Sequence, residues 1–293
     1  MNNIPTAAEI SGYLETGATV LRGVLKPEYI RALRNEIMGV IEEAAGYPCP
    51  AGDGAEQFVR RSTKILWDTI CADPTKRNQI YSYVQRVPTL YQLANAVPLR
   101  RFAAAIDIKQ PSVREAKIQM FLPWEKLFLQ ECHQDINSLD SSNSATFWIP
   151  LAPLSESTAV RYWVGSHKEG PVRHEEVVDE AAAIYLERVP QLLRDKYPTV
   201  STAVANDGDV IAINRLVFHQ SPDFDAQLYA RWSVVIRYDD IAGENLSLNQ
   251  SKYAHLTPNA AENQRLTLEK VRAHLSQKPA IDWPDKLRRA GVE

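Results

Sequence analysis

The sequence predicts a single α+β domain with a mainly β core, a sandwich or barrel that carries packed helices on its outside. Helical periodicity is concentrated in an N-terminal part, about 26–98, and short segments rich in Val, Ile, Phe, Trp and Tyr follow from about residue 115. Helices followed by a run of strands are typical of this class. No repeat, low-complexity tract or linker divides the 293 residues, so we expect one domain over 1–293.

The chain first resembles regular structure at 16–25, TGATVLRGVL, a mostly apolar stretch that favours a strand. A helix is predicted after it, because apolar residues recur at intervals of three or four, at Ile30, Leu33, Ile37 and Ile41. Pro27 suits the first turn of that helix. A loop over 46–54 precedes a second helical region over 74–97, which Pro88 should break or kink.

The predicted core, about 115–240, consists of short strands separated by turn-like clusters. The candidate strands are EAKIQMFL, SATFWIPL, AVRYWV, DVIAIN and LYARWSVVIRY. The segment 175–197 is predicted to be a helical insertion into this core, and a C-terminal helix is predicted over 259–277.

Composition excludes several classes of protein. A formal charge of −3 and a sequence pI near 6.1 argue against a protein built to hold nucleic acid or an anionic membrane. No apolar run approaches the roughly 18 residues that span a bilayer, and the N-terminus lacks a signal-peptide pattern. The three cysteines share no CxxC spacing, so a disulfide framework is not expected. We expect a cytoplasmic protein with no membrane or nucleic-acid partner.

One group of residues at the strand edges indicates metal chemistry. His133 and Asp135 lie two apart in ECHQDINS, so on an extended segment both side chains leave the same face. His219 follows the later strand DVIAIN. Two imidazoles and one carboxylate on one face of a metal form the facial triad of non-haem Fe(II) oxygenases, which leaves positions open for a co-substrate and O2. Taken alone, H-x-D favours the plainer interpretation of two polar loop residues, and a pairing of Glu131 with His133 stays open.

A strand after this group carries charge inside an apolar pattern. Arg231 in ARWSVVIRY needs an anion if it is buried, and its guanidinium matches a carboxylate through two hydrogen bonds. Ser233 lies on the same face and can donate a hydroxyl hydrogen bond to that carboxylate. Arg237 shares the face and is a rival for the same role. The alternative for either arginine is a salt bridge to a nearby Asp or Glu.

Several segments, in this order, resemble the phytanoyl-CoA dioxygenase family. They are HQDINS, SATFWIPL, AVRYWVGSHKEG, NDGDVIAINRLVFHQS and ARWSVVIRY, preceded by an opening similar to the family's first strand and helix. The resemblance spans roughly 12–240. It implies an Fe(II)- and 2-oxoglutarate-dependent oxygenase that uses O2, with a double-stranded β-helix (a cupin-like jelly roll) and packed outer helices.

The resemblance also implies roles for individual residues. His133, Asp135 and His219 match the iron ligands, Arg231 matches the 2-oxoglutarate anchor, Ser233 supports the anchor, and Gln119 lies where relatives place a polar contact to 2-oxoglutarate. Thr146 and Trp148 line the same pocket or belong to the sheet core. The family's usual E-N-G-x-L before the GSH motif is replaced by 156–160, ESTAV, which we expect to alter a turn.

The implied activity is hydroxylation of a C–H bond in a small polar metabolite or biosynthetic intermediate, with release of succinate and CO2. Related halogenases carry a small residue in place of Asp135, so its presence favours hydroxylation or another oxidation. Arg161, Lys168 and Arg215 are expected around the pocket mouth. Two alternatives stay open at this stage, a jelly-roll metalloenzyme that does not use 2-oxoglutarate and a non-catalytic small-molecule-binding relative.

Overall fold

A computed structural model describes residues 4–48, 54–125, 130–135, 141, 143–179, 184–223, 225–243, 273 and 277–292. The helices are α1 (Ala7–Thr16), α2 (Pro27–Ala45), α3 (Ala55–Ala72), α4 (Thr75–Val84), α5 (Pro88–Ala94), α6 (Val97–Ala105), α7 (Gln191–Arg194) and α10 (Trp283–Arg289), with a 3-10 turn at Ser166–Glu169. The strands are β1 (Ala18–Leu21), β2 (Pro111–Phe121), β3 (Ser144–Pro150), β4 (Arg161–Trp163), β5 (Glu175–Asp179), β6 (Ile184–Arg188), β7 (Val200–Thr202), β8 (Val210–Asn214), β9 (His219–Gln220) and β10 (Arg231–Asp240).

The N-terminal part is helical, as predicted, but it begins earlier and is more continuous. The helix predicted from Pro27 is α2, and Pro88 separates α4 from α5 by occupying the first turn of α5. Helices α1, α3 and α6 were not predicted as separate elements. Thr6 begins α1 with a capping box, and Gly17 ends it at φ 90°, where a Cβ atom would lie 2.7 Å from both His167 Nδ1 and Val217.

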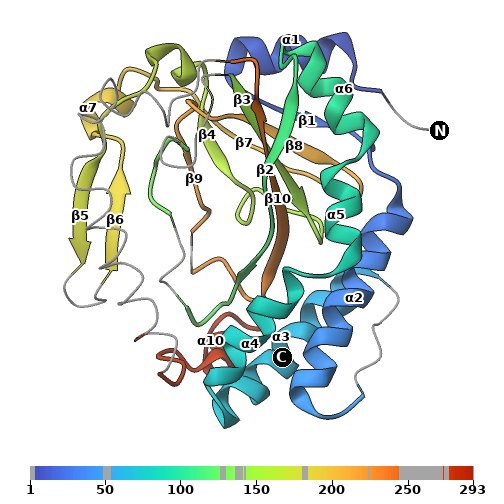
Figure 1. Cartoon of the computed structure of the whole chain (residues 1–293). Coiled ribbons are helices and arrows are strands. Elements are labelled where there is room, and N and C mark those ends of the chain that lie inside the picture. Colours follow the sequence, from blue (N-terminus) through green and yellow to red (C-terminus); the bar gives the residue numbers. More distant parts are fainter. Residues whose placement is uncertain are drawn as a thin grey trace.

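Every strand pair in the described residues is antiparallel. The largest sheet has the order β1-β8-β3-β10-β2, a second has the order β7-β4-β9, and β5 pairs with β6. Figure 1 shows helices α2 to α6 on one side of the five-stranded sheet and the β5–β6 hairpin standing apart from it. The predicted mixture of helices and antiparallel sheet is therefore confirmed.

The two faces of β10 belong to two different hydrophobic cores. Trp232, Val234 and Ile236 pack with the helices in the larger core, whereas Val235 faces the second sheet. The smaller core joins residues of both sheets, among them Trp148 of β3 and Tyr162 of β4. The two sheets thus pack face to face, and the even-numbered residues of β10, such as Trp232, face the helices.

The segment 175–197 was predicted to be a helical insertion, and this prediction is wrong. It forms the β5–β6 hairpin, in which Glu175 pairs with Arg188 and Val177 with Leu186, followed by the short helix α7. Pro190 lies inside the predicted helix, where it would remove a hydrogen bond, and in the structure it precedes α7. The helix predicted over 259–277 falls almost entirely outside the described residues.

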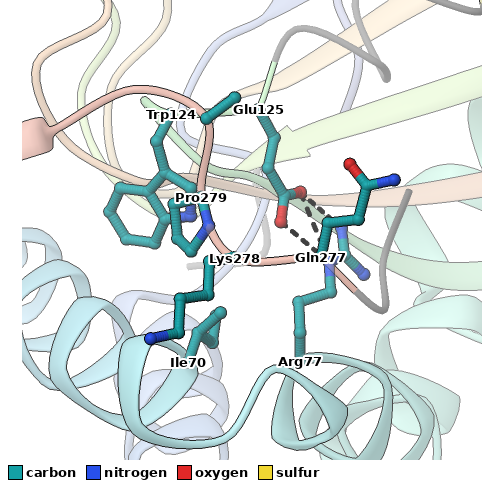
Figure 2. Close-up of a pocket in the computed structure, with 8 residues that line it drawn as sticks. Ile70, Arg77, Trp124, Glu125, Gln277, Lys278 and Pro279 are labelled. Carbon is teal, nitrogen blue, oxygen red and sulfur yellow. Dashed lines mark hydrogen bonds and ion pairs between the residues drawn. The ribbon is translucent and has the colours of Figure 1, made fainter. Parts of the chain in front are cut away.

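Near the C-terminus, α10 is held against the chain by aromatic contacts. The Trp283 ring packs on Trp67 and Trp124, and its indole N–H donates to the Leu228 carbonyl at 2.6 Å. Figure 2 shows a pocket beside these contacts, where Arg77 binds both oxygens of Glu125. None of the predicted site residues lines this pocket. Within the described residues, no helix is both long enough and apolar enough to cross a membrane.

Candidate metal centre

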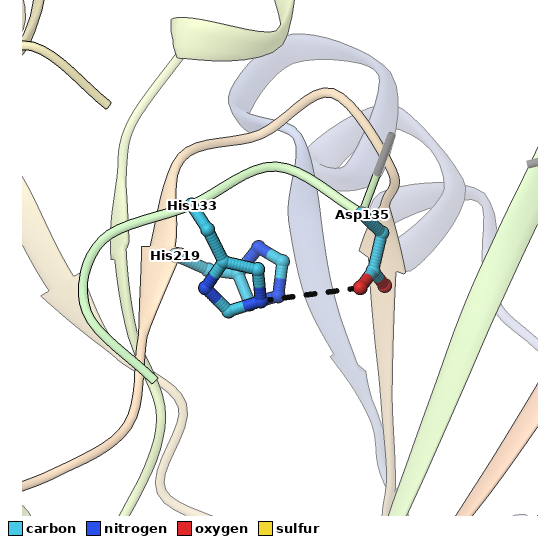
Figure 3. A group of neighbouring side chains, drawn as sticks. All are labelled: His133, Asp135 and His219. Carbon is cyan, nitrogen blue, oxygen red and sulfur yellow. Dashed lines mark ion pairs between the residues drawn. The ribbon is translucent and has the colours of Figure 1, made fainter. Parts of the chain in front are cut away.

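Backbone pairing brings two of the predicted ligands together. The His133 N–H donates to the His219 carbonyl at 2.9 Å, and the His219 N–H donates back to the His133 carbonyl at 3.0 Å. This antiparallel bridge joins the segment after β2 to strand β9 and places the two imidazole centroids 4.2 Å apart. Two histidines far apart in the sequence thus point into one space (Figure 3).

Hydrogen bonds fix which ring nitrogens are available to a ligand. His133 Nδ1 lies 2.7 Å from the Glu131 carbonyl, and His219 Nδ1 lies 3.0 Å from the Val217 carbonyl. A carbonyl oxygen only accepts, so each Nδ1 must donate, and in each neutral ring Nε2 carries the lone pair. His133 Nε2 is buried and has no hydrogen-bond partner among the described residues. Glu131 thus contributes its carbonyl to the site rather than replacing Asp135 as a ligand.

Asp135 completes the group from the opposite side (Figure 3). Its backbone N–H donates to the Arg215 carbonyl at 2.9 Å, and its Oδ1 lies 3.9 Å from His133 Nε2. One ligand atom from each of His133, Asp135 and His219 lies within 4.8 Å of the others. The sequence predicted these three residues as a group, and the structure brings them together.

The charge states of the group suit a divalent cation. Burial, together with the neighbouring His219, lowers the pKa of His133 to about 3, so the ring is neutral. Burial alone would raise the pKa of the Asp135 carboxyl, but the positive charge of Arg237, with a further contribution from Arg215, outweighs burial and holds that pKa well below its usual range. Two imidazoles whose Nδ1 atoms are held by carbonyls, together with one ionised carboxylate, match the ligand set of a non-haem iron site. The unpartnered His133 Nε2 is a further sign that a metal ion fits here.

Gln134, between the first two ligands, is a residue that the sequence reasoning missed. Its amide nitrogen donates to the carbonyls of Gly170 and Leu216, at 2.8 and 2.7 Å, and its amide oxygen accepts from the Val172 N–H at 2.9 Å. The side chain is 3% exposed. It therefore fixes the backbone that carries His133 and Asp135. The alternation of an extended segment is the only signal that could have indicated it, because its side chain must leave the opposite face.

Arg231 lies at the start of β10 and is buried without a carboxylate partner among the described residues. Its Nη1 donates to the Thr158 carbonyl at 3.3 Å, and its guanidinium lies over the rings of Phe121 and Trp148, 4.4 and 5.7 Å from their centroids. Burial lowers the pKa of this guanidinium to about 10. A buried guanidinium without a counter-charge is destabilising, and a bound anion would offset that cost.

The two other predicted co-substrate residues lie beside one another next to this arginine. Ser233 is opposite Gln119 in the β10–β2 register, and its hydroxyl donates to Gln119 Oε1 at 3.3 Å. The indole N–H of Trp148 donates to the same oxygen at 3.1 Å. Trp148 pairs with Val235, further along β10, and its indole reaches back along the strand to Gln119 and to the guanidinium of Arg231.

Arg237, the rival for the anchor role, has a different environment. It forms ion pairs with Asp135 and Glu115, which is the salt-bridge alternative left open for it. Thr146 also belongs to the site, because its hydroxyl donates to Asp135 Oδ2 at 2.9 Å. Arg215 was expected at the pocket mouth, but it is fully buried and pairs with Asp239 at 2.6 Å, because the backbone turn after β8 directs it inward.

The phytanoyl-CoA dioxygenase family model matches residues 13–224. No curated protein matches the chain by sequence. The match confirms the resemblance inferred from the motifs.

Three solved structures illustrate the structural likeness. The non-heme α-ketoglutarate-dependent carbocyclase SnoK from nogalamycin biosynthesis is 17% identical over 80% of this chain and 84% of its own, with a TM-score of 0.52. EctD from S. alaskensis, solved with 2-oxoglutarate and 5-hydroxyectoine, is 13% identical over 84% and 80%, with a TM-score of 0.52. The epimerase SnoN, solved with Fe3+, α-ketoglutarate and nogalamycin RO, is 14% identical over 81% and 84%, with a TM-score of 0.53. At these identities the likeness establishes a shared fold.

Proposed function

The chain belongs to the phytanoyl-CoA dioxygenase family, and from this premise we propose that it is an Fe(II)- and 2-oxoglutarate-dependent oxygenase that hydroxylates a C–H bond of a small polar metabolite or biosynthetic intermediate. The single observation that carries the proposal is the pairing of two sites. One is the His133, Asp135 and His219 group. The other is Arg231 on β10, a buried cation that has no carboxylate partner among the described residues.

His133, Asp135 and His219 would hold the iron through two Nε2 atoms and one carboxylate oxygen. Iron held there would supply, with 2-oxoglutarate and O2, the oxidising power needed for an unactivated C–H bond, and 2-oxoglutarate would be converted to succinate and CO2. The protein's own part is to position the substrate and 2-oxoglutarate and to exclude water. Gln134 fixes the loop that carries two of the ligands, and the smaller hydrophobic core closes the space between the sheets.

Arg231 would bind the distal carboxylate of 2-oxoglutarate. Phe121 and Trp148 exclude water from its guanidinium, which strengthens a charge-assisted hydrogen bond there. Ser233 can turn its hydroxyl from Gln119 toward the same carboxylate, because its present hydrogen bond is long at 3.3 Å. Gln119 would then keep its contact with Trp148 and stay beside the co-substrate.

We also propose that the two face-to-face antiparallel sheets form a double-stranded β-helix. The ligand group supports this arrangement, since His219 comes from the smaller sheet and Asp135 contacts strands β3 and β10 of the larger one. A polar substrate is supported by Glu115 and Lys117, which are half-buried beside this group on strand β2.

The first test is succinate formation by protein that has been reconstituted anaerobically with Fe(II) and supplied with 2-oxoglutarate and ascorbate before O2 is admitted. We expect succinate that requires all three of iron, 2-oxoglutarate and O2, and none from the His133→Ala variant. His167→Gln is the matched control, because His167 lies outside the ligand group and bonds the Leu14 carbonyl through Nε2.

The outcomes separate the remaining alternatives. Metal binding without succinate would indicate a jelly-roll metalloenzyme that does not use 2-oxoglutarate, and a protein that binds neither would be a non-catalytic relative. Once a substrate is known, incorporation of one atom from isotopically labelled O2 tests hydroxylation. A product without added oxygen would replace hydroxylation by a reaction of the kind named for the SnoK carbocyclase or the SnoN epimerase.

A further inference from the structure

Arg237 lies six residues after Arg231 on the same face of β10, and the anchor role does not account for it. Its Nη2 donates to Asp135 Oδ1 at 3.0 Å, and its Nη1 binds Glu115 on the neighbouring strand β2. Glu115 in turn lies 3.0 Å from Lys117. The guanidinium is therefore held between two carboxylates, one of which belongs to the ligand group.

Asp135 is held by a second residue, on its other oxygen. The Thr146 hydroxyl on β3 donates to Asp135 Oδ2 at 2.9 Å. Thr146 and Arg237 are directly opposite one another in the β3–β10 register, so both contacts come from one point of the five-stranded sheet. Both oxygens of the carboxylate thus have a donor, and the carboxylate plane has a fixed orientation relative to the histidines.

The two oxygens are not equivalent. Oδ1 lies 3.9 Å from His133 Nε2 and faces the imidazoles, whereas Oδ2 is bound to the sheet by Thr146. An ionised carboxylate oxygen has two acceptor positions, so Oδ1 can accept from Arg237 and bind a cation at the same time. For Oδ2 to become a second ligand, the hydrogen bond from Thr146 would have to break and the carboxylate would have to rotate.

We propose that Arg237 and Thr146 are positioning residues that restrict Asp135 to metal binding through Oδ1 alone. With one oxygen from Asp135, the ligand group would leave coordination positions open for 2-oxoglutarate and O2. The inference rests on the proposed metal site, but it concerns residues that neither bind the metal nor contact the co-substrate. Outer residues of this kind usually change metal affinity by about 10- to 100-fold when removed.

The test measures metal binding rather than turnover. Wild-type protein and the variants Arg237→Gln, Thr146→Val and Thr146→Ser are titrated with Co(II) in the absence of 2-oxoglutarate, and the Co(II) absorption spectrum is recorded at saturation. We expect the dissociation constant to rise roughly 10- to 100-fold in Arg237→Gln and several-fold in Thr146→Val, with an altered spectrum in both. Thr146→Ser keeps the hydroxyl and should restore wild-type affinity and spectrum.

Arg231→Gln is the matched control, an arginine of equal burial on the same strand. It should bind Co(II) as wild type does and lose affinity only for 2-oxoglutarate. If Arg237→Gln does not fold, the comparison of Thr146→Val with Thr146→Ser carries the test, because valine and threonine have nearly the same shape.

Wild-type affinity and spectrum in both Arg237→Gln and Thr146→Val would overturn the inference, and so would an equal loss in Thr146→Ser and Thr146→Val. Failure of the proposed function would look different. In that case the wild-type protein itself would bind no Co(II), or would bind it and form no succinate.

Discussion

Strand β10 carries two buried arginines six residues apart, and the two have opposite surroundings. Arg231 and Arg237 are both 8% exposed and share one face of the strand. Arg231 meets aromatic rings and one carbonyl, and burial lowers its pKa to about 10. Burial also opposes the charge of Arg237, but Asp135 and Glu115 outweigh it and raise the pKa of that guanidinium.

Because the two arginines are equally buried, the difference in their ion pairing separates an arginine with a structural role from one that is available to a ligand. A guanidinium between two carboxylates already has its anions and stabilises the native state, whereas a guanidinium without a carboxylate weakens the apo-protein until an anion arrives. The difference explains how a strand can carry two arginines of which one is reserved for a ligand. It also predicts that the same substitution has opposite consequences at the two positions.

The largest expected effect is on stability at Arg237. Arg237→Met should lower the free energy of unfolding of the apo-protein by about 3–5 kcal/mol, because it leaves Asp135 buried with its charge largely uncompensated. Urea unfolding followed by circular dichroism measures this change. A loss below about 1 kcal/mol would mean that Asp135 does not depend on Arg237, and the contrast between the two arginines would be lost.

The next effect is on co-substrate affinity at Arg231. Arg231→Met should weaken 2-oxoglutarate binding by about 2–3 kcal/mol, roughly 30- to 150-fold, because a charge-assisted pair in a desolvated pocket is removed. Calorimetric titration of 2-oxoglutarate into the Co(II)-loaded protein gives the value. Unchanged affinity would remove Arg231 from the anchor role.

The same Arg231→Met variant sharpens the comparison through its stability. Without 2-oxoglutarate, we expect its free energy of unfolding to equal that of wild type or to exceed it by up to about 1 kcal/mol. The reason is that a buried charge without a carboxylate partner among the described residues is replaced by an apolar side chain of similar length. The urea midpoints of Arg231→Met and Arg237→Met, each compared with wild type, show whether the two substitutions change stability in opposite directions. A strongly destabilised Arg231→Met would point to an anion partner in the protein itself.

The smallest effect concerns Ser233. Ser233→Ala removes one neutral hydroxyl whose hydrogen bond to Gln119 is long, so 2-oxoglutarate affinity should fall by about 0.5–1.5 kcal/mol, a few-fold to about tenfold. The calorimetric titration used for Arg231→Met resolves this difference. A loss as large as that of Arg231→Met would move the anchor role toward Ser233.

The ligand group was predictable from the sequence because its residue types and local spacing are specific. H-x-D places His133 and Asp135 together without any knowledge of the fold. His219 after a strand and Arg231 inside an apolar strand were candidates from their positions, and the resemblance matched them to the roles of iron ligand and 2-oxoglutarate anchor. The contacts of Asp135 with Thr146 and Arg237 were not predictable, since they depend on the register of β3 against β10, which no local pattern encodes.

The same reason accounts for the error over 175–197. Alanine, glutamate and leucine in that segment favour a helix as isolated residues, but pairing across the hairpin, with the Glu175–Arg188 ion pair at one end, determines the strands. Local propensity predicted α2 correctly because an apolar stripe and Pro27 agreed with each other there. In the hairpin the decisive contacts come from the opposite strand.

Because two backbone hydrogen bonds between His133 and His219 assemble the metal site only in the folded chain, the stability of the protein should depend on how much iron is available. They join segments that only the completed chain can bring together, so an unfolded or partly made chain offers no preformed metal site. A metal that binds only the folded state adds about 2.7 kcal/mol of stability at a free concentration one hundred times its dissociation constant. Cells short of iron would therefore hold an apo-protein that unfolds more often and is degraded sooner, so that abundance as well as activity would follow the metal.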